Sequence, residues 1–201
     1  MTAYQFIDKP TTAASLTMML DKGLGLNALD DLLELASDYI SFAKFGWGTA
    51  AVLNPALIKE KNRRYRAHRI PTYPGGTLLE VALMQGKLAE FLAESKQLGF
   101  TAIEVSDGST TVARDQRLAV IAQAKAAGFT VLAEVGKKNP AKDHQLTVAD
   151  RVTQVKDDLA AGVDHVIIEA REAGKNIGIY DEQDAQRLLD DRRPELGLIF
   201  M

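Results

Sequence analysis

The segment AGFTVLAEVGK, residues 127–137, decides the fold because its pattern occurs three times along the chain. LGFTAIEVSDG (98–108) and AGVDHVIIEAR (161–171) repeat it, with a glycine, a short apolar run and then a glutamate. A glycine just past a helix end adopts the left-handed conformation that ends many helices, and short, nearly all-apolar runs are typical of buried parallel strands. Each repeat therefore predicts a helix end followed by a buried strand. The three glycines are Gly99, Gly128 and Gly162.

Helix starts can be recognised between these strands. Asn54-Pro55 predicts an N-cap followed by a proline in the first helical turn. TLLE at residues 77–80 has the spacing of a capping box, and TVAD at residues 147–150 has the same spacing with aspartate in place of glutamate. Helices that alternate with strands in this way form right-handed βαβ units and a parallel sheet.

The order of elements predicts an α/β fold of the TIM (β/α)8-barrel type, in one domain spanning residues 1–201. A complete barrel of this type typically needs about 250 residues, so we expect an incomplete barrel of about seven strands. The predicted strands are residues 15–20, 39–44, 68–73, 102–106, 130–135, 165–170 and 196–201.

Composition and charge narrow the classes of function. Hydrophobic residues make up 46% and charged residues 25% of the 201 residues, as in ordinary globular proteins. The net charge of −3 gives no electrostatic basis for binding nucleic acid or an anionic membrane, so neither partner is expected. The absence of cysteine excludes disulfides and thiolate chemistry, and it permits the cytoplasmic location that we expect.

Charged residues fall at matching points of several predicted strands. Lys44 lies in the second strand, and Glu104, Glu134 and Glu169 lie late in the fourth, fifth and sixth. Side chains alternate between two faces along a strand, and α/β barrels place active sites at the carboxyl ends of their strands. One such glutamate could simply begin a solvated loop, whereas three of them would converge with Lys44 on one pocket. Because unpaired buried carboxylates are costly, Mg²⁺, which prefers oxygen ligands, is the expected cofactor.

Other residues near these strand ends are candidates for the same pocket. EVGKK places Lys137 and Lys138 directly after the fifth strand, where one lysine can face the pocket and the other solvent. TYPGGT, with Gly75 and Gly76, offers backbone N–H groups to an anion at a helix start, or is only a tight turn before a helix. The single tryptophan, Trp47, is expected to pack rather than to stack on a ligand. Further candidates that share these strand faces or strand ends are Lys22, Ser106 and Arg171.

Several long motifs resemble those of the phosphosulfolactate synthase family. They occur in matching order and spacing between Leu20 and about Asp181. The same family includes plant heat-stress-associated proteins of similar sequence. The motifs are DYISFAKFGWGT, PGGTLLE, AIEVSDGS, VLAEVGKK and VIIEAREAGKNIGIYD.

The resemblance implies a (β/α)8-barrel lyase that adds sulfite to phosphoenolpyruvate with Mg²⁺. The product would be (2R)-phospho-3-sulfolactate, which leads to coenzyme M biosynthesis. The family's site is compared with that of the enolase superfamily, in which carboxylates on successive strands hold Mg²⁺. That pattern falls on Glu104, Glu134 and Glu169, and the family's general acid/base lysine matches Lys137.

The resemblance has one departure, at the C-terminal end. Family members continue past the seventh strand with an EAPQ-like segment and an eighth strand with its helix, whereas this chain ends with LGLIFM, residues 196–201. We therefore expect either a shortened form, whose full activity is in question, or a barrel that a partner chain completes. Exposed strand edges favour association, so a homo-oligomer is expected.

These residues suggest a mechanism with two alternatives to it. Sulfite attacks the methylene carbon of phosphoenolpyruvate while the metal stabilises an enediolate-like charge on the substrate carboxylate. Lys137 then delivers a proton to the carbon that bears the phosphate, and Lys44 and Arg171, with Lys22, offset the negative charge of the substrates. The alternatives are another lyase or isomerase acting on a phosphorylated acid, and a non-catalytic stress-associated or assembly protein that keeps the fold.

Overall fold

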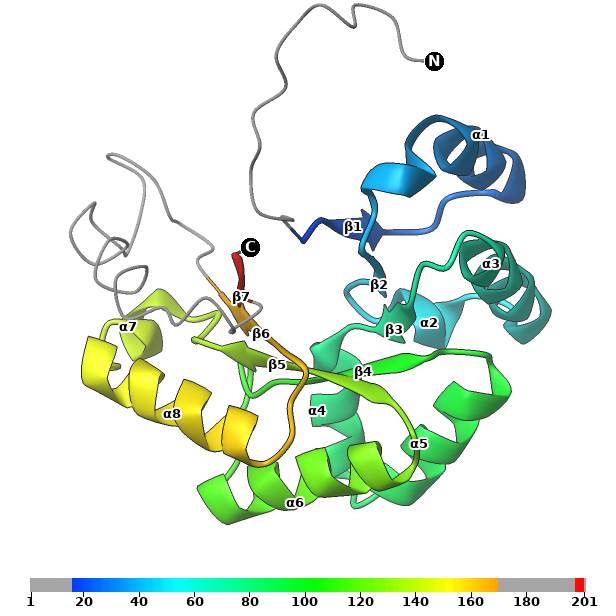
Figure 1. Ribbon diagram of the computed structural model, residues 1–201. Coiled ribbons are helices and arrows are strands. Elements are labelled where there is room, and N and C mark those ends of the chain that lie inside the picture. Colours follow the sequence, from blue (N-terminus) through cyan, green and yellow to red (C-terminus); the bar gives the residue numbers. More distant parts are fainter. Residues whose placement is uncertain (1–15, 170–197, 201) are drawn as a thin grey trace, which may run out of the picture.

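The computed structural model describes residues 16–169 and 198–200, in which parallel strands alternate with helices (Figure 1). The described strands match the seven predicted ones in order, so the α/β architecture is confirmed. They are β1 (Met18–Asp21), β2 (Phe42–Phe45), β3 (Thr72–Pro74), β4 (Ala102–Val105), β5 (Thr130–Val135), β6 (His165–Ile168) and β7 (Leu198–Phe200).

The strands form one curved layer built from two sheets. The first sheet has the order β1-β2-β3 and the second β4-β5-β6-β7, and every pairing is parallel. β3 and β4 lie side by side at the junction, where the Thr101 N–H donates to the Thr72 carbonyl oxygen at 3.1 Å (Figure 1). The curve is that of part of a TIM barrel, and the described residues contain no pairing between β1 and β7.

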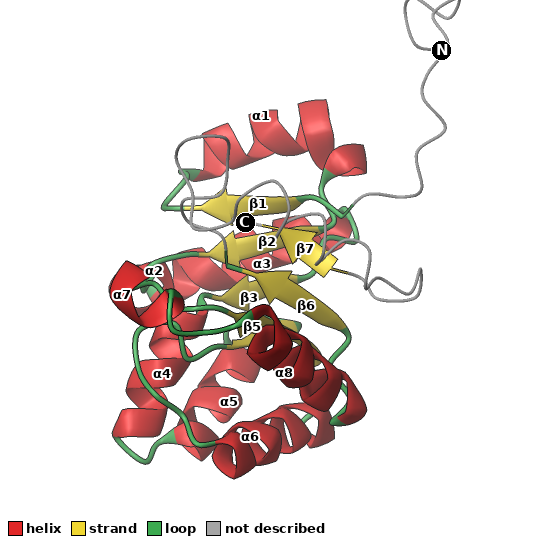
Figure 2. Ribbon diagram, turned by 90° about the vertical axis from the view of Figure 1, so that its left-hand side faces the viewer, coloured by secondary structure: helices red, strands yellow, loops and turns green. Residues whose placement is uncertain are grey.

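Helices cover the outer side of this strand layer (Figure 2). Within the described ranges, no helix is long and apolar enough to cross a membrane. The helices are α1 (Leu26–Ala36), which a 3-10 turn (Ser37–Tyr39) extends, α2 (Thr49–Val52), α3 (Pro55–Ala67), α4 (Gly76–Met84), α5 (Leu88–Gln97), α6 (Arg114–Ala126), α7 (Pro140–Asp143) and α8 (Val148–Ala160).

Most of the predicted helix ends are confirmed. The Asn54 side chain accepts a hydrogen bond from the Ala56 N–H, and Thr147 and Asp150 form a reciprocal capping box. The capping box predicted at residues 77–80 is wrong, because α4 begins at Gly76 with Gly75 as its N-cap, two residues before Thr77. The glycines that follow α5, α6 and α8 have φ angles in the left-handed region, as predicted: Gly99 at 87°, Gly128 at 80° and Gly162 at 99°.

Two strands begin later than predicted because the preceding helices run further. β2 begins at Phe42 rather than at residue 39, because the 3-10 turn Ser37–Tyr39 follows α1 directly. β3 begins at Thr72 rather than at residue 68, because α3 continues to Ala67 and Arg69 then turns the chain with a φ of 62°. Both shifts lie at the amino ends of the strands. The carboxyl ends of β2 and β3 lie within one residue of the predicted ends.

Side-chain alternation sorts the apolar residues into separate clusters. In β5, Val131, Ala133 and Val135 belong to the cluster between strands and helices, whereas Leu132 belongs to the cluster inside the curve. That inner cluster lies at the level below the carboxyl ends of the strands. We call it the apolar floor, and its buried members are Phe42, Tyr73, Ala102, Leu132 and Ile167.

Candidate active site

A layer of charged side chains lies directly above the apolar floor. Each charged residue comes two positions after a floor residue in its strand, so alternation turns both toward the inside. All are buried, with exposures of 5%, 1%, 0% and 7% in chain order. We call this set the inner polar layer; its members are Lys44, Glu104, Glu134 and Glu169.

Lys44 is the cation of the inner polar layer and lies between two of the glutamates. Its Nζ donates to Glu104 Oε1 at 3.0 Å, lies 2.8 Å from Glu104 Oε2 and is 3.7 Å from Glu134 Oε2. Burial alone would lower the pKa of Lys44, but attraction to Glu104 and Glu134 outweighs burial and the net shift is upward. Lys44 therefore stays protonated, as a fixed positive charge. The structure confirms that Lys44, Glu104 and Glu134 converge.

The glycines of TYPGGT bring the start of α4 against Glu104. The Gly76 N–H donates to Glu104 Oε1 at 2.9 Å, and the Gly75 N–H donates to the Phe45 carbonyl oxygen at 2.9 Å. A Cβ added at Gly76 would lie 2.2 Å from Ser106 Oγ and 2.7 Å from Glu104 Oε1, so no larger residue fits. These N–H groups thus serve oxygens of the chain itself, and the helix start binds a carboxylate that the protein supplies.

Glu80 is a buried carboxylate that the sequence interpretation missed. It is 1% exposed and accepts hydrogen bonds from Ser106 Oγ at 2.6 Å, from the Ser109 N–H at 2.9 Å and from Thr110 Oγ1 at 3.0 Å. These bonds fix the loop between β4 and α6 against α4. The capping-box spacing at residues 77–80 had suggested a local partner for Glu80, and its true partners are distant in sequence.

Glu134 has unused hydrogen-bonding capacity at both of its carboxylate oxygens. Neither of its carboxylate oxygens accepts a hydrogen bond from the described residues. Burial, together with the negative charge of Glu104, raises the pKa of Glu134 from 4.5 to about 8, against the opposing pull of Lys44 and Lys138. A buried carboxylate of this kind is a candidate ligand for a cation. Within the described residues, however, no three His, Cys, Asp or Glu side chains are already grouped as a metal site.

The two lysines after β5 point to different places. Lys137 Nζ donates to the Asp107 carbonyl oxygen at 2.8 Å and to the Asp107 carboxylate, in the loop after β4. Lys138 Nζ instead donates to Thr77 Oγ1 at 2.8 Å, in the first turn of α4. Of the two, Lys138 is the one that lowers the pKa of Glu134. The expectation that Lys137 joins the glutamates is therefore not met in this structure, and Lys138 lies beside them instead.

The remaining sequence candidates are placed as follows. Lys22 lies at the carboxyl end of β1, with its Nζ 3.8 Å from the ring centre of Trp47. Trp47, which is expected to pack rather than to stack on a ligand, is 69% exposed, so it is not part of the core. Ser106 adjoins Gly76 and bonds Glu80, whereas Arg171 lies outside the described residues.

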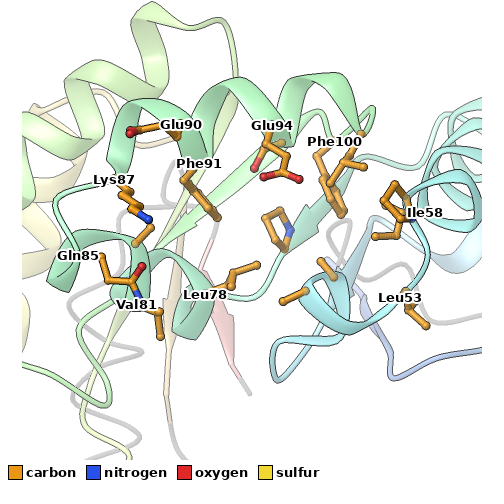
Figure 3. Close-up of a pocket in the computed structure, with 17 residues that line it drawn as sticks. Leu53, Ile58, Leu78, Val81, Gln85, Lys87, Glu90, Phe91, Glu94 and Phe100 are labelled. Atoms are coloured by element: carbon orange, nitrogen blue, oxygen red, sulfur yellow. The ribbon is translucent and has the colours of Figure 1, made fainter.

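A cleft lined mainly by apolar side chains lies away from the inner polar layer. It has a volume of about 450 Å³ and opens between α2 and α3 on one side and α4 and α5 on the other (Figure 3). Apolar side chains such as Leu53, Leu78 and Phe91 line much of it. Its charged lining includes Glu90 on α5 and Lys87, the residue that precedes α5. None of its lining residues belongs to the inner polar layer, so it is not the candidate active site.

The curved parallel layer and the buried lysine–glutamate cluster at its carboxyl ends define a TIM-barrel-like enzyme. Solved structures agree on the fold alone, at low sequence identity. Phosphonopyruvate hydrolase in complex with oxalate and Mg²⁺ has a TM-score of 0.59 and 15% identity, over 93% of this chain and 67% of that one. Phosphoenolpyruvate phosphomutase from Streptomyces platensis subsp. rosaceus has a TM-score of 0.60 and 12% identity, over 94% and 69%.

Sequence relatives identify the family. The profile of (2R)-phospho-3-sulfolactate synthase (ComA) matches residues 7–189. The phosphosulfolactate synthase of Methanocaldococcus jannaschii is 49% identical over 183 residues, which cover 91% of this chain and 72% of that protein. The one of Methanothermobacter thermautotrophicus is 42% identical over 203 residues, covering 96% and 79%. The chain belongs to the phosphosulfolactate synthase family, whose members are lyase-type enzymes.

Proposed function

We propose that this chain catalyses the Mg²⁺-dependent addition of sulfite to phosphoenolpyruvate, giving (2R)-phospho-3-sulfolactate. Family membership supports the reaction. The observation that carries the proposal is Glu134, a fully buried carboxylate with two unbonded oxygens, which lies between a protonated lysine and a second lysine. Because burial and the negative charge of Glu104 outweigh the attraction of these lysines, Glu134 favours either a proton or an added cation.

The carboxylates of the inner polar layer fit a hard divalent cation. Glu104 Oε2 and both oxygens of Glu134 accept no hydrogen bond from described residues, and Glu169 adds a further buried carboxylate. Mg²⁺ prefers oxygen ligands and usually takes only one or two carboxylates, so Glu134 with Glu104 or Glu169 would hold it. When bound, Mg²⁺ would act as a Lewis acid for charge on the substrate carboxylate.

The reaction itself forms one carbon–sulfur bond and takes up one proton. The sulfur lone pair of sulfite bonds to the methylene carbon of phosphoenolpyruvate, and the electron pair of the double bond moves toward the substrate carboxylate. A proton then adds to the carbon that bears the phosphate, and no redox step occurs. Lys44 offsets the negative charge of the substrates, because its own pKa is held upward by Glu104 and Glu134.

Lys138 is the lysine that we propose for proton delivery. A Cβ added at Gly108 would lie 3.0 Å from Glu134 Oε1 and 3.2 Å from Lys138 Cε, so the lysine chain passes close to the carboxylate. Its Nζ then reaches Thr77 at the start of α4, beside the Gly76–Glu104 contact. A proton donor must lie within hydrogen-bond reach of the reacting carbon, and the closeness of the Lys138 side chain to Glu134 supports this role.

The test combines substrate omission with a matched pair of lysine variants. Phosphorus NMR should show a new phosphorylated acid only when phosphoenolpyruvate, sulfite and Mg²⁺ are all present. Lys138→Met should lower the rate about 10²–10⁴-fold, the range for general acid catalysis. Lys142→Met, at an exposed lysine on α7, removes the same charge and should leave the rate unchanged. A sulfite-independent loss of phosphoenolpyruvate would instead indicate another lyase or isomerase.

A further inference from the structure

Lys137 is held by three oxygen atoms of one loop. Its ammonium donates to the Asp107 carbonyl oxygen at 2.8 Å, to the Asp107 carboxylate and to the Thr110 carbonyl oxygen at 3.4 Å. The Lys137 side chain is 13% exposed and that of Asp107 is 11% exposed, so the ion pair is nearly buried. An ammonium has three N–H donors, and these contacts use all of them. Lys137 would have to break a buried ion pair before it could donate a proton to a substrate.

The ion pair belongs to a longer buried network that ends on Glu134. Asp107 Oδ1 lies 3.5 Å from Arg117 Nη1. Arg117 donates to both carboxylate oxygens of Asp158, at 2.8 and 2.7 Å, and to the Glu134 carbonyl oxygen at 3.0 Å. Arg117 is 4% and Asp158 is 1% exposed. Two cations and two anions thus balance, and they link Lys137 to the backbone that carries the unbonded carboxylate.

Backbone contacts join the same two loops. The Lys138 N–H donates to the Gly108 carbonyl oxygen at 2.9 Å, and the Lys137 N–H donates to Asp143 Oδ1 at 2.6 Å. Asp143 is held in turn by Arg151 Nη2 at 2.7 Å. The loop after β5 is therefore fixed on both sides, which determines the direction in which the Lys138 side chain leaves the backbone.

We propose that Lys137 is a positioning residue, which locks the loop after β4 to the loop after β5 and thereby aims Lys138 at the inner polar layer. The role rests on the proposed function, since it assigns Lys138 to the reacting side and Lys137 to the supporting side. Asp107 and Arg117 belong to the same unit. A shift of about 1 Å in a catalytic group can lower a rate about 10²-fold, so a supporting ion pair affects the rate without touching the substrate.

Four variants separate positioning by Lys137 from proton donation by Lys137. Lys137→Met should lower kcat about 30- to 100-fold with the KM for phosphoenolpyruvate within about threefold of wild type. Asp107→Asn should lower kcat by a similar factor, and the Asp107→Asn/Lys137→Met double variant by no more than either single change, because the two residues act as a unit. Lys137→Arg should restore kcat to within about tenfold of wild type, since a guanidinium also binds a carboxylate.

The opposite pattern would overturn the inference. If Lys137 donates the proton, Lys137→Arg should be as inactive as Lys137→Met. The exposed Lys142→Met variant is the matched control for the loss of one positive charge.

A measurement without substrate keeps this inference separate from the proposed function. Hydrogen exchange in Lys137→Met should be faster by about tenfold or more in residues 106–110 and 136–143, and unchanged elsewhere. Lys138→Met should leave both segments protected. If wild type fails to consume phosphoenolpyruvate with sulfite, the proposed function fails, while this exchange pattern still decides the role of Lys137. Unchanged hydrogen exchange in Lys137→Met would overturn the positioning role of Lys137.

Discussion

Lys61 and Lys44 are both buried lysines that contact carboxylates, and they lie on opposite sides of the same strand layer. On the helix side, Lys61 donates to Asp21 Oδ1 at 2.8 Å and to the Leu24 carbonyl oxygen at 2.9 Å. The Tyr65 hydroxyl donates to Asp21 Oδ2 at 2.9 Å. Each Asp21 oxygen thus has a partner, and the cluster ties the end of β1 to α3.

Inside the curve, Lys44 lies near the carboxylates of both Glu104 and Glu134. It bonds Glu104, while the oxygens of Glu134 accept no hydrogen bond from the described part of the chain. Buried polar groups in proteins are normally paired, and exceptions concentrate where a ligand, an ion or a proton completes the set. Burial of charge therefore does not itself mark a functional site. A better indicator is a buried carboxylate that, like Glu134, accepts no hydrogen bond from the described residues.

Replacing each lysine by methionine should affect mainly the catalytic rate in the Lys44 cluster and mainly the free energy of unfolding in the Lys61 cluster. Lys44→Met should lower the rate of sulfite-dependent phosphoenolpyruvate consumption about 10²–10³-fold, because it removes a fixed positive charge beside the substrates. Lys61→Met should lower the free energy of unfolding by about 3–5 kcal/mol, because Asp21 loses its buried partner. Lys61→Met that remains folded should keep the wild-type rate.

Urea denaturation and the steady-state rate, measured on both variants, check this contrast. Lys44→Met should lose less stability than Lys61→Met, because the inner carboxylates can take up a proton when their cation is gone. Equal losses of stability in the two variants would contradict the distinction between the clusters.

The pH dependence of stability should sharpen the same contrast. Unfolded Glu134 releases its proton near pH 4.5 and folded Glu134 near pH 8, because burial and Glu104 disfavour its charge. Between these values the folded state binds more protons, so the free energy of unfolding should fall as the pH rises, by about 4 kcal/mol from pH 4.5 to pH 8. Glu134→Gln should remove this slope.

Denaturation of metal-free protein between pH 5 and 8 tests the expectation. Added Mg²⁺ should restore stability at pH 8 in wild type and not in Glu134→Gln, because a bound cation replaces the proton. Identical slopes for wild type and Glu134→Gln would show that Glu134 has an ordinary pKa in the folded state.

The strand order and the inner carboxylates could be predicted because both follow from local rules. Alternation along a short strand fixes which residues face inward, and it placed Lys44, Glu104 and Glu134 correctly. Alternation continued from Glu134 through Gly136 also reaches Lys138, so this signal was present in the sequence. The assignment of Lys137 came from the family resemblance, and the structure turns that side chain toward Asp107 instead.

The rest depends on contacts between distant loops. Glu80 binds Ser106, Ser109 and Thr110, between 26 and 30 residues away, and no spacing rule predicts such partners. The observed start of α4 differs from the predicted one for a related reason, because the Gly76 N–H donates to Glu104 on β4. Propensity and capping patterns describe only residues that are close in sequence. At Glu80 and at the start of α4, contacts between residues that are distant in sequence determine the structure.

Lys22 provides an exposed counterpart to the two buried lysines, with the smallest expected effect on stability. It lies over Trp47, the only tryptophan of the chain, and an exposed cation–π pair contributes about 0.5–1 kcal/mol. If Lys22 turns toward the phosphate of phosphoenolpyruvate, the ring loses its cation and the fluorescence of Trp47 should change on titration. Lys22→Met should lower stability by about 1 kcal/mol or less and abolish the change. Wild-type fluorescence that stays constant while calorimetry shows binding would place Lys22 with the structural lysines.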